Sequence, residues 1–262
     1  MEIQKNLEII EERISAACEK AGRSRDEVKL VAVSKRKPAE AVIEAAEAGQ
    51  ILFGENRVQE AQTKIPMCPQ HLHWHLIGHL QSNKAKRAAG LFRMIHSVDS
   101  EKLMRALDEH AATPLPILIQ VNVSGEGSKS GCLPEEVAAL IEAANACSQV
   151  EVHGLMTIPP FTSDPEKARG HFSNLRKLRD QLQEKTGTPL PELSMGMSND
   201  FEIAIEEGAT LFAWAPIFLV GGRGDKFIAR TKERQNYDYG IESRIYWRGQ
   251  HGRGDCQRHG GG

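Results

Sequence analysis

The sequence predicts a (β/α)₈ barrel of the TIM type, an α/β fold in a single domain. Short apolar runs alternate with longer amphipathic stretches along most of the chain, and eight such runs can be distinguished. Parallel strands joined by crossover helices produce this alternation. The length of 262 residues suits one such barrel. A doubly wound open sheet is the alternative, and in both folds ligands bind at the carboxyl ends of the strands.

The expected strands are short runs rich in Val, Ile, Leu and Met. They lie at residues 30–34, 51–53, 73–77, 94–98, 117–123, 151–156, 192–195 and from 210 onward. Helices are expected near residues 38–48, 56–64, 80–90, 100–110, 134–147, 164–185 and 199–207, after an amphipathic and acidic N-terminal helix over 1–20. Several of them have start signals, such as Pro134 before two glutamates and Asp164 before Pro165.

The composition is that of an ordinary globular protein, with 40% hydrophobic and 26% charged residues. A net charge of -2 argues against a nucleic-acid or anionic-membrane partner. No apolar run approaches the roughly 20 residues of a membrane span, and the N-terminal helix does not have the pattern of a signal peptide. The five cysteines are scattered, odd in number and without CxxC spacing. They indicate a reducing cytoplasm, no disulfides and no metal site.

The segment KLVAVSKRKPAE, residues 29–40, contains the most informative strand end. Lys35 comes directly after an apolar strand, at the edge where a barrel binds its ligands. Desolvation at such a mouth lowers the pKa of a lysine, and a neutral amine can form a Schiff base with an aldehyde. Arg36 and Lys37 would lower this pKa further. The alternative is that all three are solvated loop residues.

The segment SMGMSND, residues 194–200, follows the seventh expected strand and enters a helix. Its hydroxyl and backbone N–H groups can bind a phosphate, and Gly196 permits close approach. The alternative is that Ser198 is the N-cap of that helix, with Asp200 and Glu202 near the first turn. The two interpretations are compatible, because the same N–H groups would serve both.

Two further strand ends carry polar side chains. Asn56 follows the second strand, where it is a candidate helix cap. On the third strand, His73 and His75 are expected to share one face and Trp74 and Leu76 the other. His75 would then point toward the mouth as a ligand contact. A metal held by alternate histidines is the alternative, but no carboxylate or cysteine cluster completes such a site.

Several segments are similar to those of one known family when they are read together. They are LVAVSKRKP, FGENRVQEA, HWHLIGHLQSNK, HSVDSEKL, IQVNVSGEGSKSG, GLMTI and LSMGMSNDFEIAIEEGAT. In this order they resemble the pyridoxal phosphate homeostasis protein family, whose fold is similar to the N-terminal barrel of alanine racemase (fold type III). The resemblance extends over about residues 1–211.

The resemblance implies that Lys35 carries pyridoxal 5′-phosphate as a Schiff base and that the loop 194–198 lies against its phosphate. The cofactor-binding residues that it implies are Lys35, Asn56, His75, Ser194, Met195, Gly196 and Ser198. It also implies a protein that balances free and protein-bound cofactor, with apo-enzymes as partners and no established catalysis. Because the chain has no separate β-domain, we expect a monomer. The alternative is a racemase-type enzyme. Alanine racemases take their second acid/base, a tyrosine, from an added β-domain, and residues 1–236 of this chain contain no tyrosine.

The chain departs from the family pattern after Thr210. The family's last strand has an arginine near the pyridine nitrogen, then Gly-Thr at the phosphate, whereas this chain reads LFAWAPIFLVGG. A codon choice for Val-Arg-Val-Gly-Thr-Asp-Ile-Phe-Gly-Gly, read one base late, gives Phe-Ala-Trp-Ala-Pro-Ile-Phe-Leu-Val-Gly, which is residues 212–221. We interpret this as a reading-frame shift that removes phosphate donors, while the segment stays apolar enough to close the barrel.

The C-terminal region has a different composition from the rest of the chain. Residues 221–262 contain ten of the 23 glycines and nine Lys/Arg against five Asp/Glu, without helical or strand periodicity. An RNA-binding arm is one interpretation, and disorder is the one that we favour. The expected division is therefore a barrel over residues 1–220 and an atypical, frame-shifted tail over 221–262.

Overall fold

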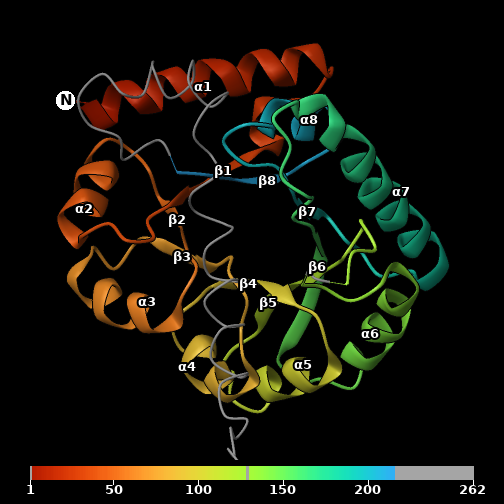
Figure 1. Cartoon of the computed structure of the whole chain (residues 1–262). Helices are drawn as coiled ribbons and strands as arrows, with labels where there is room; N and C mark the ends of the chain where they lie inside the picture. Colours follow the sequence, from red (N-terminus) through yellow and green to blue (C-terminus); the bar gives the residue numbers. More distant parts are fainter. Residues whose placement is uncertain (1, 128–129, 216–262) are drawn as a thin grey trace, which may run out of the picture.

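The computed structural model describes residues 2–127 and 130–215, which form a closed barrel of eight parallel strands in the order β1 to β8 (Figure 1). The strands are β1 Lys29–Val33, β2 Leu52–Glu55, β3 His73–Leu76, β4 Met94–Val98, β5 Leu115–Gln120, β6 Val150–Met156, β7 Glu192–Ser194 and β8 Leu211–Trp214. The predicted barrel is confirmed, and the open sheet is wrong, because β8 pairs with both β7 and β1.

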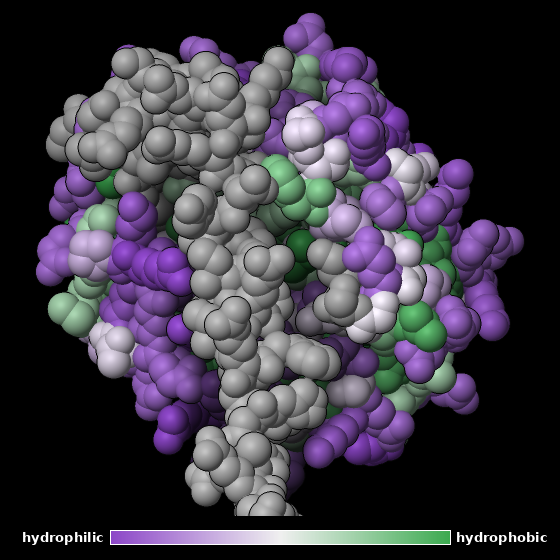
Figure 2. Space-filling view, in the orientation of Figure 1, coloured by the Kyte–Doolittle hydropathy of each residue, from purple (hydrophilic) through white to green (hydrophobic). Residues whose placement is uncertain are grey.

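Helices surround the barrel, as each parallel connection requires. They are α1 Glu2–Lys20, α2 Ala39–Glu47, α3 Val58–Lys64, α4 Ala85–Ala89, α5 Glu101–Asp108, α6 Val137–Ala144, α7 Arg169–Thr186 and α8 Phe201–Glu206. Short 3₁₀ turns precede α4, α6 and α7. In the view of Figure 2 the described surface is mainly hydrophilic, with smaller hydrophobic areas between the polar ones.

Strand alternation divides the apolar side chains into two cores. Val31, Met94, Leu118, Met156 and Leu211 pack together inside the barrel. Their neighbours in sequence point outward into a larger core under the helices. The expected faces of β3 are confirmed, since Trp74 and Leu76 lie in this outer core.

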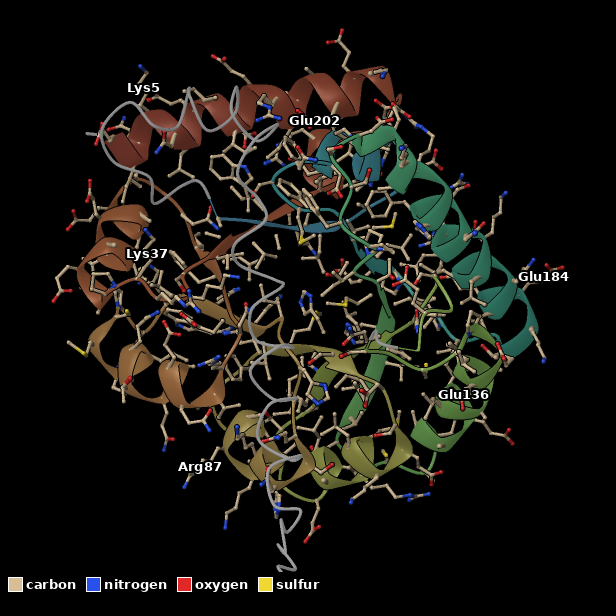
Figure 3. The ribbon with its side chains drawn as sticks, viewed as in Figure 1. Lys5, Lys37, Arg87, Glu136, Glu184 and Glu202 are labelled. Atoms are coloured by element: carbon tan, nitrogen blue, oxygen red, sulfur yellow. The ribbon has the colours of Figure 1, made fainter. Side chains whose placement is uncertain are left out.

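The N-terminal helix α1 packs along the outside of the barrel against α8 (Figure 1). Arg13 of α1 binds Glu202 of α8 at 2.5 Å, and its guanidinium lies 4.7 Å from the centre of the Phe201 ring. Figure 3 labels Glu202. The described part of the chain contains no helix that is long and apolar enough to cross a membrane.

The final strand closes the barrel. Residues 211–214 of β8 pair in register with residues 29–32 of β1, which confirms that this segment is apolar enough for closure. Its outward side chains, Phe212 and Trp214, are buried in the outer core. The indole Nε1 of Trp214 has no hydrogen-bond partner among the described residues, which is unfavourable in a buried position. Pro216 and the predicted tail, 221–262, lie outside the described residues.

Two predicted helix caps are wrong. Strand β2 continues to Glu55, which pairs with Leu76, so α3 begins later and its N-cap is Arg57 instead of Asn56. Helix α8 has Asp200 at its N-cap instead of Ser198. The Asp200 carboxylate accepts the Met197 N–H at 2.7 Å, and the Asp200 N–H donates to the Met197 carbonyl at 3.1 Å. These two bonds form a turn, so α8 begins only at Phe201.

Candidate functional site

Lys35 lies at the carboxyl end of β1. Val31 points into the barrel, so Val33, the last residue of β1, points to the same side. Lys35 follows two residues after Val33. The chain then turns, because the Lys37 N–H donates to the Ser34 carbonyl at 3.0 Å. Arg36 has φ 59°, which is uncommon for a residue with a side chain. Lys35 as a whole residue is half-buried.

Asn56 follows β2 on the inward column that contains Leu52 and Gly54. Gly78 lies against its backbone: a Cβ on Gly78 would be 2.4 Å from the Asn56 carbonyl oxygen, so only glycine fits there. The Oδ1 atom of Asn56 is buried and has no hydrogen-bond partner within the described residues. A buried acceptor without a donor is costly, and a ligand that donates a hydrogen bond would remove this cost.

A chain of polar side chains crosses the barrel interior from β3 through β4 to β7. Nδ1 of His75 lies 2.9 Å from Nε2 of His96, and Nδ1 of His96 lies 2.8 Å from Oγ of Ser194. Both rings are buried. Because each neutral imidazole has one donor and one acceptor nitrogen, all the protons in this chain must point in one direction.

Burial keeps both histidines neutral. It lowers the pKa of His75 to about 3, with smaller contributions from the nearby charges of His73, Lys29 and Arg93. It also lowers the pKa of the fully buried His96 well below its usual value, and His75 adds to this effect. The pair is therefore a neutral donor–acceptor relay at neutral pH. A metal site was the sequence alternative, and the described residues contain no group of three potential ligands.

The loop 194–198 connects β7 to α8. Gly196 has φ +92°, and a Cβ there would be 2.5 Å from the Cβ of Ala204. The Ala215 N–H donates to Oγ of Ser198 at 3.4 Å. Within the described residues, the backbone N–H groups of Ser198 and Asn199 have no acceptor. Met195 is buried in the outer core and therefore supports the loop from behind.

Replacing Gly196 by alanine is expected to lower the free energy of unfolding. The matched control is Gly187→Ala at the end of α7, where φ is +69° and a Cβ would contact nothing within 4 Å. Both changes strain the backbone, but only Gly196→Ala adds a clash, so it is expected to cost about 1–3 kcal/mol more than the control. Denaturant unfolding of both variants measures this difference. Equal losses would show that the loop moves freely away from Ala204.

The structure therefore brings Lys35, Asn56, His75, Ser194, Gly196 and Ser198 to the carboxyl half of the barrel, and places Met195 behind the loop. His96 was missed. The signal that predicts it is the alternation of side chains along a strand, since Met94 points inward and His96 is two residues later.

A cavity of about 450 Å³ lies at the opposite end of the barrel, lined by Lys29, Glu192 and Thr210 among others. Lys29 and Glu192 there are paired at 2.6 Å.

Comparison with known proteins gives a consistent result. Residues 6–215 match the family described as "Alanine racemase, N-terminal domain". The pyridoxal phosphate homeostasis protein of Aquifex aeolicus is 46% identical over 204 residues, which is 76% of this chain and 90% of the relative. PipY of Synechococcus elongatus, solved with PLP bound, is 36% identical with a TM-score of 0.69, over 80% of this chain and 100% of PipY. Alanine racemase of Corynebacterium glutamicum is similar in fold alone, at 19% identity and a TM-score of 0.59, over 81% of this chain and 61% of the racemase.

Proposed function

Because the chain belongs to the pyridoxal phosphate homeostasis protein family, we propose that it binds pyridoxal 5′-phosphate at the carboxyl mouth of its barrel and balances the bound and free cofactor. The single observation that carries this proposal is the half-buried Lys35 at that mouth, on the same barrel as a loop with available N–H groups. PipY, a related chain with PLP bound, supports it.

The side chains at the mouth suit an aromatic aldehyde that carries a phosphate. When bound, this cofactor supplies an aldehyde that reacts with primary amines. Lys35 is the amine in reach of the mouth. The Ser198 and Asn199 N–H groups and the Ser198 hydroxyl can bind phosphate oxygens, and Gly196 leaves room for them. Asn56 offers the buried acceptor Oδ1, and His75 offers a neutral ring whose proton position is set by His96.

The test is to locate the covalent bond. The full chain is mixed with pyridoxal phosphate, its visible absorption band is recorded, and the product is reduced with borohydride and mapped by peptide mass spectrometry. We expect the pyridoxyl group on Lys35. Lys35→Ala is expected to abolish the band completely, because no other amine replaces the Schiff-base lysine.

Lys37→Ala is the matched control, since it removes a lysine from the same loop (labelled in Figure 3). It is expected to keep the band and the labelled peptide. A band that persists in Lys35→Ala, or a label on another lysine in the wild type, would contradict the proposal. So would a folded wild-type chain that forms no band.

We also propose that the protein acts in the cytoplasm as a monomeric carrier that supplies apo-enzymes, which is consistent with the four described cysteines being free thiols. No observation favours the racemase-type alternative. All three tyrosines of the chain follow residue 236, so the part of the chain that the structure describes cannot provide the tyrosine that alanine racemases use.

A further inference from the structure

A buried ionic cluster lies directly behind the loop that carries Lys35. Its members are Glu55 at the end of β2, and Glu60 and Lys64 of α3. Nζ of Lys64 lies 2.6 Å from Glu55 and 2.9 Å from Glu60. The Glu55 side chain is fully buried and that of Lys64 is 6% exposed. Glu55 and Lys64 are therefore withdrawn from water almost completely, whereas the Glu60 side chain is 25% exposed.

The cluster holds the two peptide groups that flank Lys35. On one side, Nζ of Lys64 donates to the carbonyl oxygen of Ser34 at 2.7 Å. On the other side, the Arg36 N–H donates to the carboxylate of Glu60. The Ser34 hydroxyl also donates to Glu55, at 2.7 Å. Two of these three bonds thus hold the backbone immediately before and after Lys35, and the third holds the side chain of Ser34.

The loop needs this support, because its own sequence does not favour its conformation. Arg36 adopts a left-handed φ of 59°, which costs a residue with a Cβ about 1–2 kcal/mol. Glycine or asparagine would favour such a turn position. An external restraint is therefore required to keep the chain turned here.

Stability alone is a poor reason for burying these charges. Burial raises the pKa of Glu55, although its bonds to Lys64 and Ser34 act in the opposite direction. A buried ion pair of this kind contributes little to stability compared with apolar residues of similar volume. Apolar residues in place of the cluster could not form the hydrogen bonds that hold the loop of Lys35.

We propose that Glu60 and Lys64, oriented by Glu55, are positioning residues that aim the amine of Lys35 into the barrel mouth. The inference rests on the proposed function, because it gives Lys35 its task. A misplacement of about 1 Å can slow a reaction by about a hundredfold. The cluster therefore controls how fast Lys35 reacts, while the affinity of the mouth for the phosphate depends on the loop 194–198.

The test compares three substitutions in the full chain. Glu60→Ala removes the acceptor of the Arg36 N–H, whereas Glu60→Gln keeps an acceptor oxygen without the charge. Asp108→Ala is the matched control, because this carboxylate also binds backbone N–H groups, those of residues 148–150, but does so before β6 at the other end of the barrel. All three are expected to fold.

Two measurements separate positioning from binding and from general stability. The first is the rate of Schiff-base formation with pyridoxal phosphate, measured beside the affinity for pyridoxine 5′-phosphate, which has the ring and the phosphate but no aldehyde. The second is hydrogen exchange of the Arg36 amide in cofactor-free protein, which reports on the loop whether or not the cofactor binds.

Glu60→Ala is expected to slow Schiff-base formation about tenfold, to leave pyridoxine 5′-phosphate affinity within about twofold, and to speed Arg36 exchange about tenfold. Glu60→Gln is expected to restore most of both rates. Asp108→Ala is expected to lower the Tm without changing either rate. If Glu60→Ala leaves both rates at their wild-type values, or changes them only as much as Asp108→Ala does, the inference is wrong.

If the proposed function is wrong, the result differs from a failure of the positioning role: the wild type forms no Schiff base, but hydrogen exchange of the Arg36 amide still responds to Glu60→Ala.

A second variant tests Lys64. Lys64→Met alone leaves Glu55 as an unpaired buried charge, so it is combined with Glu55→Gln. This double variant is expected to fold and to slow Schiff-base formation as Glu60→Ala does. A wild-type rate in the double variant would exclude Lys64 from the positioning role.

Discussion

Acidification from pH 7 toward pH 4 is expected to destabilise this protein through two histidines inside its barrel. Burial lowers the pKa of His75 to about 3 and that of His96 well below its usual value. Below about pH 6.5 the unfolded chain therefore binds protons that the folded chain excludes, and stability falls as the pH falls. The stabilisation is fully present above pH 6.5. Each histidine contributes a slope of about 1.4 kcal/mol per pH unit.

The measurement is the free energy of unfolding in denaturant, recorded from pH 7 to pH 4. His75→Leu/His96→Leu replaces the hydrogen-bonded pair with apolar side chains, a change that is often nearly neutral at pH 7. We expect this variant to lose the histidine part of the slope, while the carboxylates contribute equally to both proteins. His79→Leu is the matched control, because the His79 side chain is 54% exposed, and it should follow the wild type. Equal slopes in the wild type and the double variant would contradict the prediction.

The barrel itself could be predicted because its signals are local and repeated. All eight expected strands overlap observed ones, since a strand buried on both sides reads as a short apolar run with defined ends. Element boundaries were less predictable. The sequence places a cap at Asn56, but pairing between Glu55 and Leu76 extends β2 and delays α3. Tertiary pairing of this kind is not encoded in the capping residue.

The site could be predicted only in part, because its support comes from residues far apart in sequence. Lys35 and the loop 194–198 follow strands directly, so the barrel rule finds them. His96 and Lys64 do not stand out in the sequence. His96 reads as one residue of an apolar strand, and Lys64 as the last surface residue of a helix. Only the closed barrel shows that His96 joins His75 to Ser194 and that Lys64 reaches back to Ser34.

Introducing an arginine at position 213 is expected to strengthen binding of pyridoxal phosphate. Leu211 points into the barrel and Phe212 and Trp214 point outward, so Ala213 shares the inward face of β8. If residues 212–221 result from the frame shift that the sequence predicts, Ala213 stands where the family's last strand has its arginine. A guanidinium there can donate to the pyridine nitrogen. One such charge-assisted bond is expected to raise the affinity about tenfold.

The comparison that isolates the charge is Ala213→Arg against Ala213→Met, which fills the same space without a donor. Titration of the full chain with pyridoxal phosphate is expected to show a gain for arginine alone. If both variants bind equally, or both bind more weakly than the wild type, the inward space of β8 does not face the pyridine ring. The coding DNA gives an independent check, since a single-base deletion or insertion near codon 211 restores the family's Arg-x-Gly-Thr pattern only if the frame shift occurred. A gain for Ala213→Arg together with such a restored pattern would show that this barrel retains the fold of a cofactor carrier and has lost one of its donors.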